Sequence, residues 1–107
     1  MKKIVVYCAI PHHPGVDTIE NAEWGFDLDE KEYAHEICGE RGSDINFYNE
    51  IKNELPHNWK NRLVTPVGGP GPGAITGNFP IEDFKNPQKV LKLIRKFWPK
   101  AAKRLEI

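Results

Sequence analysis

The first hydrophobic positions of the chain form one short run. Residues 4–10 are apolar and mostly β-branched or aromatic, which is typical of a buried β-strand. Pro11 should end this strand, because proline has no backbone N–H to pair. Residues 24–28 alternate apolar and polar positions, which predicts a short strand at the edge of a sheet.

The middle of the chain changes to the spacing of two helices. Asp29 as N-cap and Glu32 three residues later mark the start of the first helix, and Gly39 marks its end. The side chains that should share one face of it are Tyr33, Ala34, Ile37 and Cys38. Ser43 is the expected N-cap of the second helix, and Pro56 ends it. Its apolar positions recur at helical spacing: Ile45, Tyr48, Ile51 and Leu55.

Two further strands are predicted on either side of a glycine- and proline-rich segment. Residues 62–67 have a strand-like pattern, in which Pro66 favours an edge position. Residues 68–73 contain only glycine and proline, so no regular element is expected there. Residues 74–79 should then form another strand.

The last part of the chain has the clearest helical pattern. Asn86 is a good cap, Pro87 suits the first helical position, and the helix should extend to about Leu105. Pro99 lies inside this range and should kink the helix or split it in two. The apolar positions fall on one side, and Phe97 and Trp98 are expected to anchor them to the sheet.

Together these elements predict an α+β fold. We expect a small sheet led by residues 4–10, two central helices, and the C-terminal amphipathic helix packed on one sheet face. A chain of 107 residues is the size of a single domain, so residues 1–107 are expected to form one globular unit.

The composition of the chain also indicates where in the cell the protein is expected. The longest apolar run has seven residues, against the roughly 20 that a membrane-spanning helix needs, and no small-residue cleavage site follows it. We therefore expect a cytoplasmic protein that does not enter a membrane. In that compartment Cys8 and Cys38 should be reduced thiols rather than a disulfide. Nothing in the sequence indicates a cofactor.

The charged residues are divided unevenly along the chain. The whole chain has 15 basic and 15 acidic side chains, yet residues 1–55 hold five basic and twelve acidic ones. Residues 56–107 hold ten basic and three acidic ones. Either the two halves face each other, within one chain or between copies in a homo-oligomer, or the basic segment faces an outside partner.

Seven of the ten basic residues in 56–107 lie on the predicted C-terminal helix. Its lysines fall on the side opposite the apolar face: Lys89, Lys92, Lys96, Lys100 and Lys103. A solvated surface would account for them, since lysine is usually exposed. The alternative is a contact surface for the phosphates of a nucleic acid or for an acidic protein.

Adjacent histidines follow the first strand and suggest a catalytic alternative. His12 and His13 lie in a proline-flanked turn, and histidine can act as a general acid or base near neutral pH. Two such residues could serve a small metal-independent hydrolase or nuclease. No Ser, Asp or Lys stands at a known catalytic spacing from them, so an exposed polar turn also explains them.

A tetrahedral zinc site is a further candidate. Its four ligands would be Cys8, His12, His35 and Cys38. The pair on the first helix is three residues apart and could share a face. The pair on the first strand has no zinc-knuckle spacing, and both cysteines suit apolar core positions.

The sequence therefore favours a binding protein over an enzyme. We expect a small regulator or inhibitor, of the kind found in bacterial or phage accessory systems, that acts through separate acidic and basic surfaces. Its partner would be a protein or a nucleic acid held by the basic C-terminal helix. The His-dependent hydrolase and a homo-oligomer held by charge remain the alternatives.

Overall fold

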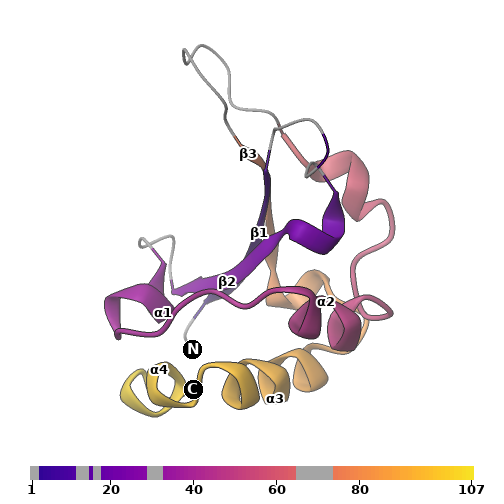
Figure 1. Cartoon of the computed structure of the whole chain (residues 1–107). Helices are drawn as coiled ribbons and strands as arrows, with labels where there is room; N and C mark the ends of the chain where they lie inside the picture. The colour runs from indigo at the N-terminus through magenta and orange to yellow at the C-terminus, as the bar shows by residue number, and fades with distance from the viewer. Residues whose placement is uncertain (1–2, 12–14, 16–17, 29–32, 65–73) are drawn as a thin grey trace.

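A three-stranded antiparallel sheet forms the centre of the molecule (Figure 1). The computed structural model of the chain describes residues 3–11, 15, 18–28, 33–64 and 74–107. The strands are β1 (Ile4–Pro11), β2 (Glu23–Leu28) and β3 (Ala74–Pro80), arranged in the order β2-β1-β3. The strands expected at 4–10, 24–28 and 74–79 are therefore confirmed, and 24–28 is an edge strand as predicted.

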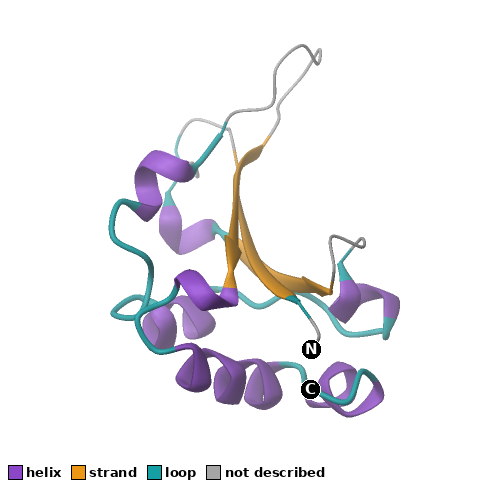
Figure 2. Cartoon of the chain, turned by 180° about the vertical axis from the view of Figure 1, so that it is seen from behind, coloured by secondary structure: helices purple, strands orange, loops and turns teal. Residues whose placement is uncertain are grey.

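Within the described residues, four α-helices and three 3₁₀ turns complete the fold, which confirms the α+β class. The helices are α1 (Ala34–Ile37), α2 (Ile45–Ile51), α3 (Pro87–Phe97) and α4 (Pro99–Arg104). The turns are η1 (Ile19–Asn21), η2 (Trp59–Arg62) and η3 (Ile81–Asp83). Seen from behind in Figure 2, most of the helical segments lie on one side of the sheet and beneath its lower end, whereas α1 lies on the other side, next to β2. Within the described residues, no helix combines the length and the apolar character needed to cross a bilayer.

The hydrophobic core lies between the sheet and these helices. Alternate residues of β1 point into it, and the register places Val6 beside Phe26 of β2 and Phe79 of β3, all with 0% exposure. This alternation follows from the two-residue period of a strand. The largest fully buried side chains are Trp24, Trp98, Phe26, Phe47 and Phe79.

The C-terminal helix is split at the expected place. Asn86 Oδ1 accepts from Lys89 N at 3.2 Å to cap α3, and Trp98 between α3 and α4 leaves helical geometry before Pro99. Trp98 is buried against Phe26 and Phe47, with ring centroids 5.6 and 4.9 Å away. Its predicted anchoring role is confirmed, whereas Phe97 is only partly buried.

The first predicted helix is much shorter than expected. It has one turn, and its proposed start at 29–32 lies outside the described residues. The predicted apolar face is wrong, because Tyr33 and Ile37 are 45% and 64% exposed. Ala34 and His35 are the buried pair instead. Tyr33 has left-handed φ, as does Gly39 beyond the other end, so the helix ends after one turn.

The N-cap of the second helix is Asp44, not Ser43. Asp44 Oδ1 accepts from Asn46 N at 3.1 Å. Ser43 instead exchanges two backbone hydrogen bonds of 2.7 and 2.8 Å with Trp24, on the outer edge of β2. The edge of a strand has unpaired backbone groups, and here they bond to the backbone of Ser43, so the neighbouring Asp44 caps the helix. The sequence alone does not distinguish these two residues as caps.

The strand expected at 62–67 is wrong for the part that is described. Arg62 ends the η2 turn, and Val64 forms only an isolated bridge to Thr76, with hydrogen bonds of 2.7 and 2.9 Å. Residues 65–67 and the Gly/Pro segment 68–73 lie outside the described residues. Val64 therefore covers the outer edge of β3, as Ser43 covers that of β2.

Candidate functional site

The segment formed by α3 and α4 carries charge of only one sign. Residues 87–104 include no acidic side chain and seven basic ones: Lys89, Lys92, Arg95, Lys96, Lys100, Lys103 and Arg104. All five lysines are exposed, while Val90, Ile94 and Trp98 are buried on the other side. We call this exposed surface the basic face.

Part of this charge is neutralised within the chain. Lys96 Nζ lies 2.9 Å from a carboxylate oxygen of Glu50, and Lys89 Nζ lies 3.3 Å from one of Glu54. Both glutamates belong to the acidic half, at α2 and the turn after it. The acidic and basic halves of the sequence therefore face each other along one side of α3.

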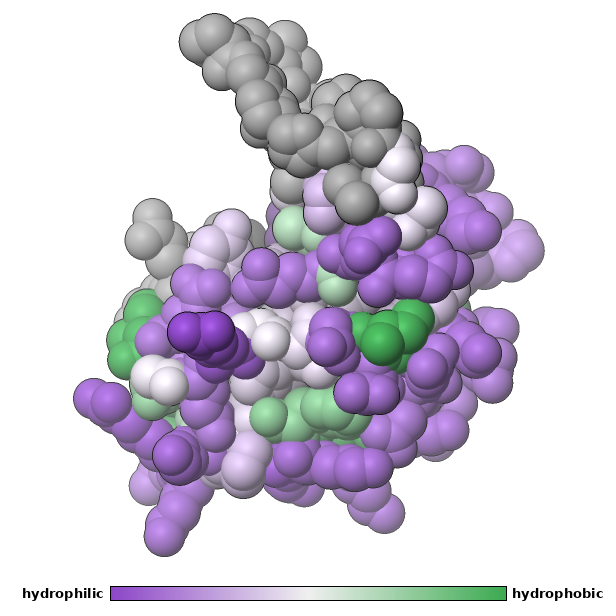
Figure 3. Space-filling view, viewed as in Figure 1, coloured by the Kyte–Doolittle hydropathy of each residue, from purple (hydrophilic) through white to green (hydrophobic). Residues whose placement is uncertain are grey.

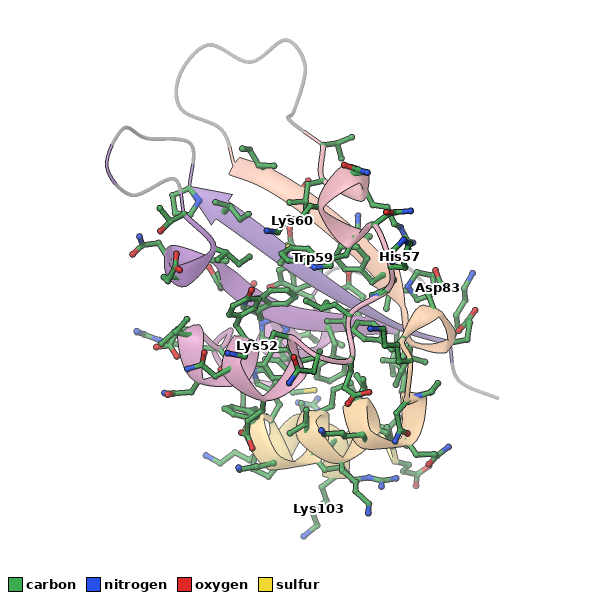
Figure 4. The ribbon with its side chains drawn as sticks, turned by 90° about the vertical axis from the view of Figure 1, so that its right-hand side faces the viewer. Lys52, His57, Trp59, Lys60, Asp83 and Lys103 are labelled. Atoms are coloured by element: carbon green, nitrogen blue, oxygen red, sulfur yellow. The ribbon has the colours of Figure 1, made fainter. Side chains whose placement is uncertain are left out.

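The rest of the basic face has no such partner. Within the described residues, Lys92, Lys100 and Lys103 form no ion pair. Figure 4 shows Lys103 pointing away from the sheet, below the helical layer. The break at Trp98 divides the lysines into one group on α3 and one on α4, so they do not form one continuous helical ridge.

Little exposed apolar surface accompanies these charges. Figure 3 shows one side of the molecule as mostly hydrophilic, with hydrophobic residues in small separate patches. Among the described residues, the exposed large hydrophobic side chains are Tyr33, Ile37 and Val64, none of them on α3 or α4. The basic face can therefore attract an anion but offers no apolar anchor.

A second arrangement of polar groups surrounds His35 at the outer edge of β2. The His35 side chain has 0% exposure, although the residue follows the first position of α1. Its Nδ1 lies 3.4 Å from both N and O of Phe26, so the ring caps the strand edge beyond Ser43. Its Nε2 lies 3.2 Å from Tyr7 Oη.

Gly25 makes this packing possible. It pairs with Tyr7 across the sheet, and a Cβ at this position would lie 2.5 Å from Tyr7 Cε1 and would overlap His35 Cε1. Only a residue without a side chain lets both rings approach the strand this closely.

Two glutamates complete the group. Carboxylate oxygens of Glu23 and Glu36 and a ring nitrogen of His35 all lie within 4.8 Å of one another. Both glutamates also line a shallow depression of about 490 Å³ with Gly39, Glu40, Arg41 and Gly42. Burial, and then the charges of Glu23 and Glu36, raise the pKa of Tyr7, so its hydroxyl stays protonated.

Comparison with known proteins adds nothing to this geometry. No family model, curated protein or solved structure matches the chain. Both candidate sites must be interpreted from the chemistry of their own side chains.

The zinc candidates do not assemble around one point in the described part of the chain. Cys8 is fully buried in the core side of β1, where burial raises its pKa to about 12, and Cys38 follows α1. The group of potential metal ligands found there joins His35 to Glu23 and Glu36 and includes neither cysteine. His12 and His13 lie outside the described residues.

Sequence reasoning missed three members of this group. Tyr7, Glu23 and Glu36 are not among the candidate site residues that the sequence indicated. One signal could have indicated a close approach: Gly25 interrupts a strand pattern between two aromatic residues. The approach of His35 could not be foreseen, since it depends on the one-turn length of α1.

Proposed function

We propose that this chain is a small cytosolic binding protein, with a regulatory or inhibitory role, that contacts the phosphates of a nucleic acid through the basic face. One observation carries the proposal: Lys92, Lys100 and Lys103 are exposed and have no ion pair within the described residues. Positive charge left over after internal pairing attracts a polyanion and releases its counterions on binding.

The surface chemistry favours nucleic acid over an acidic protein. Protein interfaces are usually anchored by buried aromatic or large aliphatic side chains, and none of the described exposed ones is on α3 or α4. A phosphate backbone needs only charges in reach. Lysine also lacks the planar fork with which arginine reads base edges, so the contact would depend little on sequence.

Binding to a fluorescently labelled DNA or RNA duplex of arbitrary sequence, followed by anisotropy at several salt concentrations, tests this proposal. The informative variant is Lys92→Gln/Lys103→Gln, which removes two charges from the basic face. A matched control is Lys52→Gln/Lys60→Gln, because these exposed lysines lie on α2's end and η2, away from that face (Figure 4).

We expect the basic-face variant to bind more weakly and to lower the slope of log affinity against log salt by roughly 0.9 per lost phosphate contact. The control should bind like the wild type. Equal losses in both variants would show that net charge alone matters. No binding at about 50 mM salt would leave the basic face as a solvated surface.

The same samples test the homo-oligomer alternative. If acidic and basic halves of different copies held each other, the molecular mass would fall as salt rises from about 0.1 to 1 M, where the screening length drops from about 10 to 3 Å. We expect a mass independent of salt, because Glu50 and Glu54 already pair with lysines of the same chain. Light scattering at both salt concentrations measures it.

A further inference from the structure

The side chains of Tyr7, Glu23, His35 and Glu36 form a group of possible metal ligands that includes none of the lysines of the basic face. We propose that Glu23, His35 and Glu36 bind a divalent first-row transition metal ion such as Zn²⁺, with the Tyr7 hydroxyl beside it. The proposal does not depend on nucleic-acid binding. Its starting observation is that all three ligand groups lie within 4.8 Å of one another.

The orientation of His35 is the first argument. A metal-binding histidine usually donates its other ring N–H to a backbone carbonyl or carboxylate, which fixes the ring and directs the free lone pair at the ion. Here Nδ1 lies 3.4 Å from the carbonyl oxygen of Phe26, and Nε2 faces Tyr7 Oη. With the proton on Nδ1, the lone pair of the ring is on Nε2, next to the Tyr7 hydroxyl.

The spacing of these two atoms is the second argument. Nε2 of His35 and Oη of Tyr7 are 3.2 Å apart. Two ligand atoms each about 2.1 Å from one ion, and separated by that distance, subtend an angle of about 100° at it. This value lies between octahedral and tetrahedral angles, so an ion beside both atoms would replace the hydrogen bond between Nε2 and Oη without requiring the strand to move.

The carboxylates supply the third argument. Glu23 and Glu36 are exposed, lie within 4.8 Å of each other, and form no ion pair within the described residues. Two carboxylates this close repel each other unless a cation lies between them. A divalent ion would balance both charges, and their flexible side chains can close the remaining distance.

The donor types select the class of ion. One imidazole nitrogen with carboxylate oxygens suits Zn²⁺ or Mn²⁺, whereas Ca²⁺ and Mg²⁺ favour oxygen ligands alone. No thiolate takes part, because Cys8 points into the core. The fully buried His35 side chain fixes one ligand in place, and the two exposed glutamates leave an approach from solvent.

Calorimetric titration with Zn²⁺, together with the visible absorption of added Co²⁺, tests the site in the full chain without an affinity tag. The variants Glu23→Gln and Glu36→Gln each remove a charged ligand without touching the core. Glu20→Gln is the matched control, since it makes the same change at an exposed position on η1. A thermal melt in chelator verifies that every variant is folded.

We expect wild type and Glu20→Gln to bind one ion with the same affinity, and each ligand variant to bind at least about tenfold more weakly. Two results would overturn the proposal. One is no Zn²⁺ binding by the wild type at millimolar concentrations. The other is unchanged binding in Glu23→Gln and Glu36→Gln. In that case loss of binding in His12→Gln/His13→Gln would assign the ion to the histidine pair instead.

Discussion

The basic face and the His35 group adjoin the same tryptophan, yet they are built in opposite ways. The lysines come from one stretch of 15 residues at helical spacing, and two of them pair with α2 and the turn after it. The His35 group joins β1, β2 and α1, and its central hydrogen bond links residues 28 positions apart. The spacing of the lysines can be recognised from neighbouring residues alone. The residues of the His35 group come together only in the completed fold.

The two regions should also differ in how they respond to substitution. On the basic face each lysine is exposed, and surface ion pairs typically contribute about 1 kcal/mol or less. Around His35 the side chains touch one another, so one change disturbs several contacts. Substitutions that cost stability should therefore concentrate at the edge of β2 and at the tryptophan that adjoins both regions.

The largest effect is expected at Trp98, which belongs to both regions. Its ring lies 5.4 Å from His35 and 4.9 Å from Phe47, and its Nε1 donates to Arg41 O at 2.7 Å. Trp98→Ala should cost about 3–5 kcal/mol of unfolding free energy, because it leaves a large cavity. Urea unfolding measures this loss.

Phe97→Ala is the comparison for that experiment. Phe97 is only partly buried and meets Phe47 edge-on at 5.3 Å, so its loss should cost clearly less than that of Trp98. An equal loss of unfolding free energy in the two variants would mean that Phe97 anchors the C-terminal segment as strongly as Trp98 does. A loss below about 1 kcal/mol for Trp98→Ala would contradict the shared anchor.

Much of the fold was predictable because its signals are local. The apolar run of β1 needs only neighbouring residues to be recognised, and so do Asn86-Pro87 at the start of α3 and Pro99 at its break. The exposure of the lysines followed from the same periodicity. The same local residues that stabilise these elements also make them recognisable in the sequence.

The errors share one physical cause, which is competition from a distant partner. Ser43 could cap a helix, but its backbone forms hydrogen bonds with Trp24 at the open edge of β2, and Asp44 caps the helix instead. Tyr33 and Ile37 had the spacing of a core face, yet His35 is the side chain that the fold buries. No local pattern distinguishes a histidine on a helix surface from one that caps a strand.

A substitution that leaves the basic face intact should break the His35 group. Gly25→Ala would place a Cβ 2.6 Å from Tyr7 Oη and against His35, so one of the rings must move. Overpacking of this kind typically costs about 1–3 kcal/mol. Urea unfolding measures the loss, and salt-dependent nucleic-acid binding by the folded variant should match the wild type.

A double-mutant cycle identifies the source of that cost. In a His35→Ala background the added methyl group has one ring fewer to meet, so Gly25→Ala should cost less than in the wild type. If the cost is the same in both backgrounds, the strand itself resists alanine and His35 is not responsible.

The smallest expected effect lies at Asp27, which follows Phe26 on β2 and accepts hydrogen bonds from the start of α1. Asp27 is half-buried on the sheet face that carries Tyr7, in a depression lined also by Lys3, Val5 and Arg62. Burial raises the pKa of its carboxyl above the ordinary 3.8, while the backbone N–H groups of Ala34 and Tyr33 oppose this shift. Folded Asp27 therefore takes up a proton at higher pH than the unfolded chain does.

The sign of the pH effect follows from that difference. As pH falls through the folded pKa, the native state binds the proton first and gains stability, and this gain is complete below the ordinary 3.8. Asp27→Asn keeps an oxygen that accepts from the backbone but cannot titrate. Urea unfolding at pH 7 and pH 4 should show the wild type gaining stability relative to Asp27→Asn as the pH is lowered. A constant difference between the two proteins would mean that Asp27 is as well solvated in the fold as in the unfolded chain.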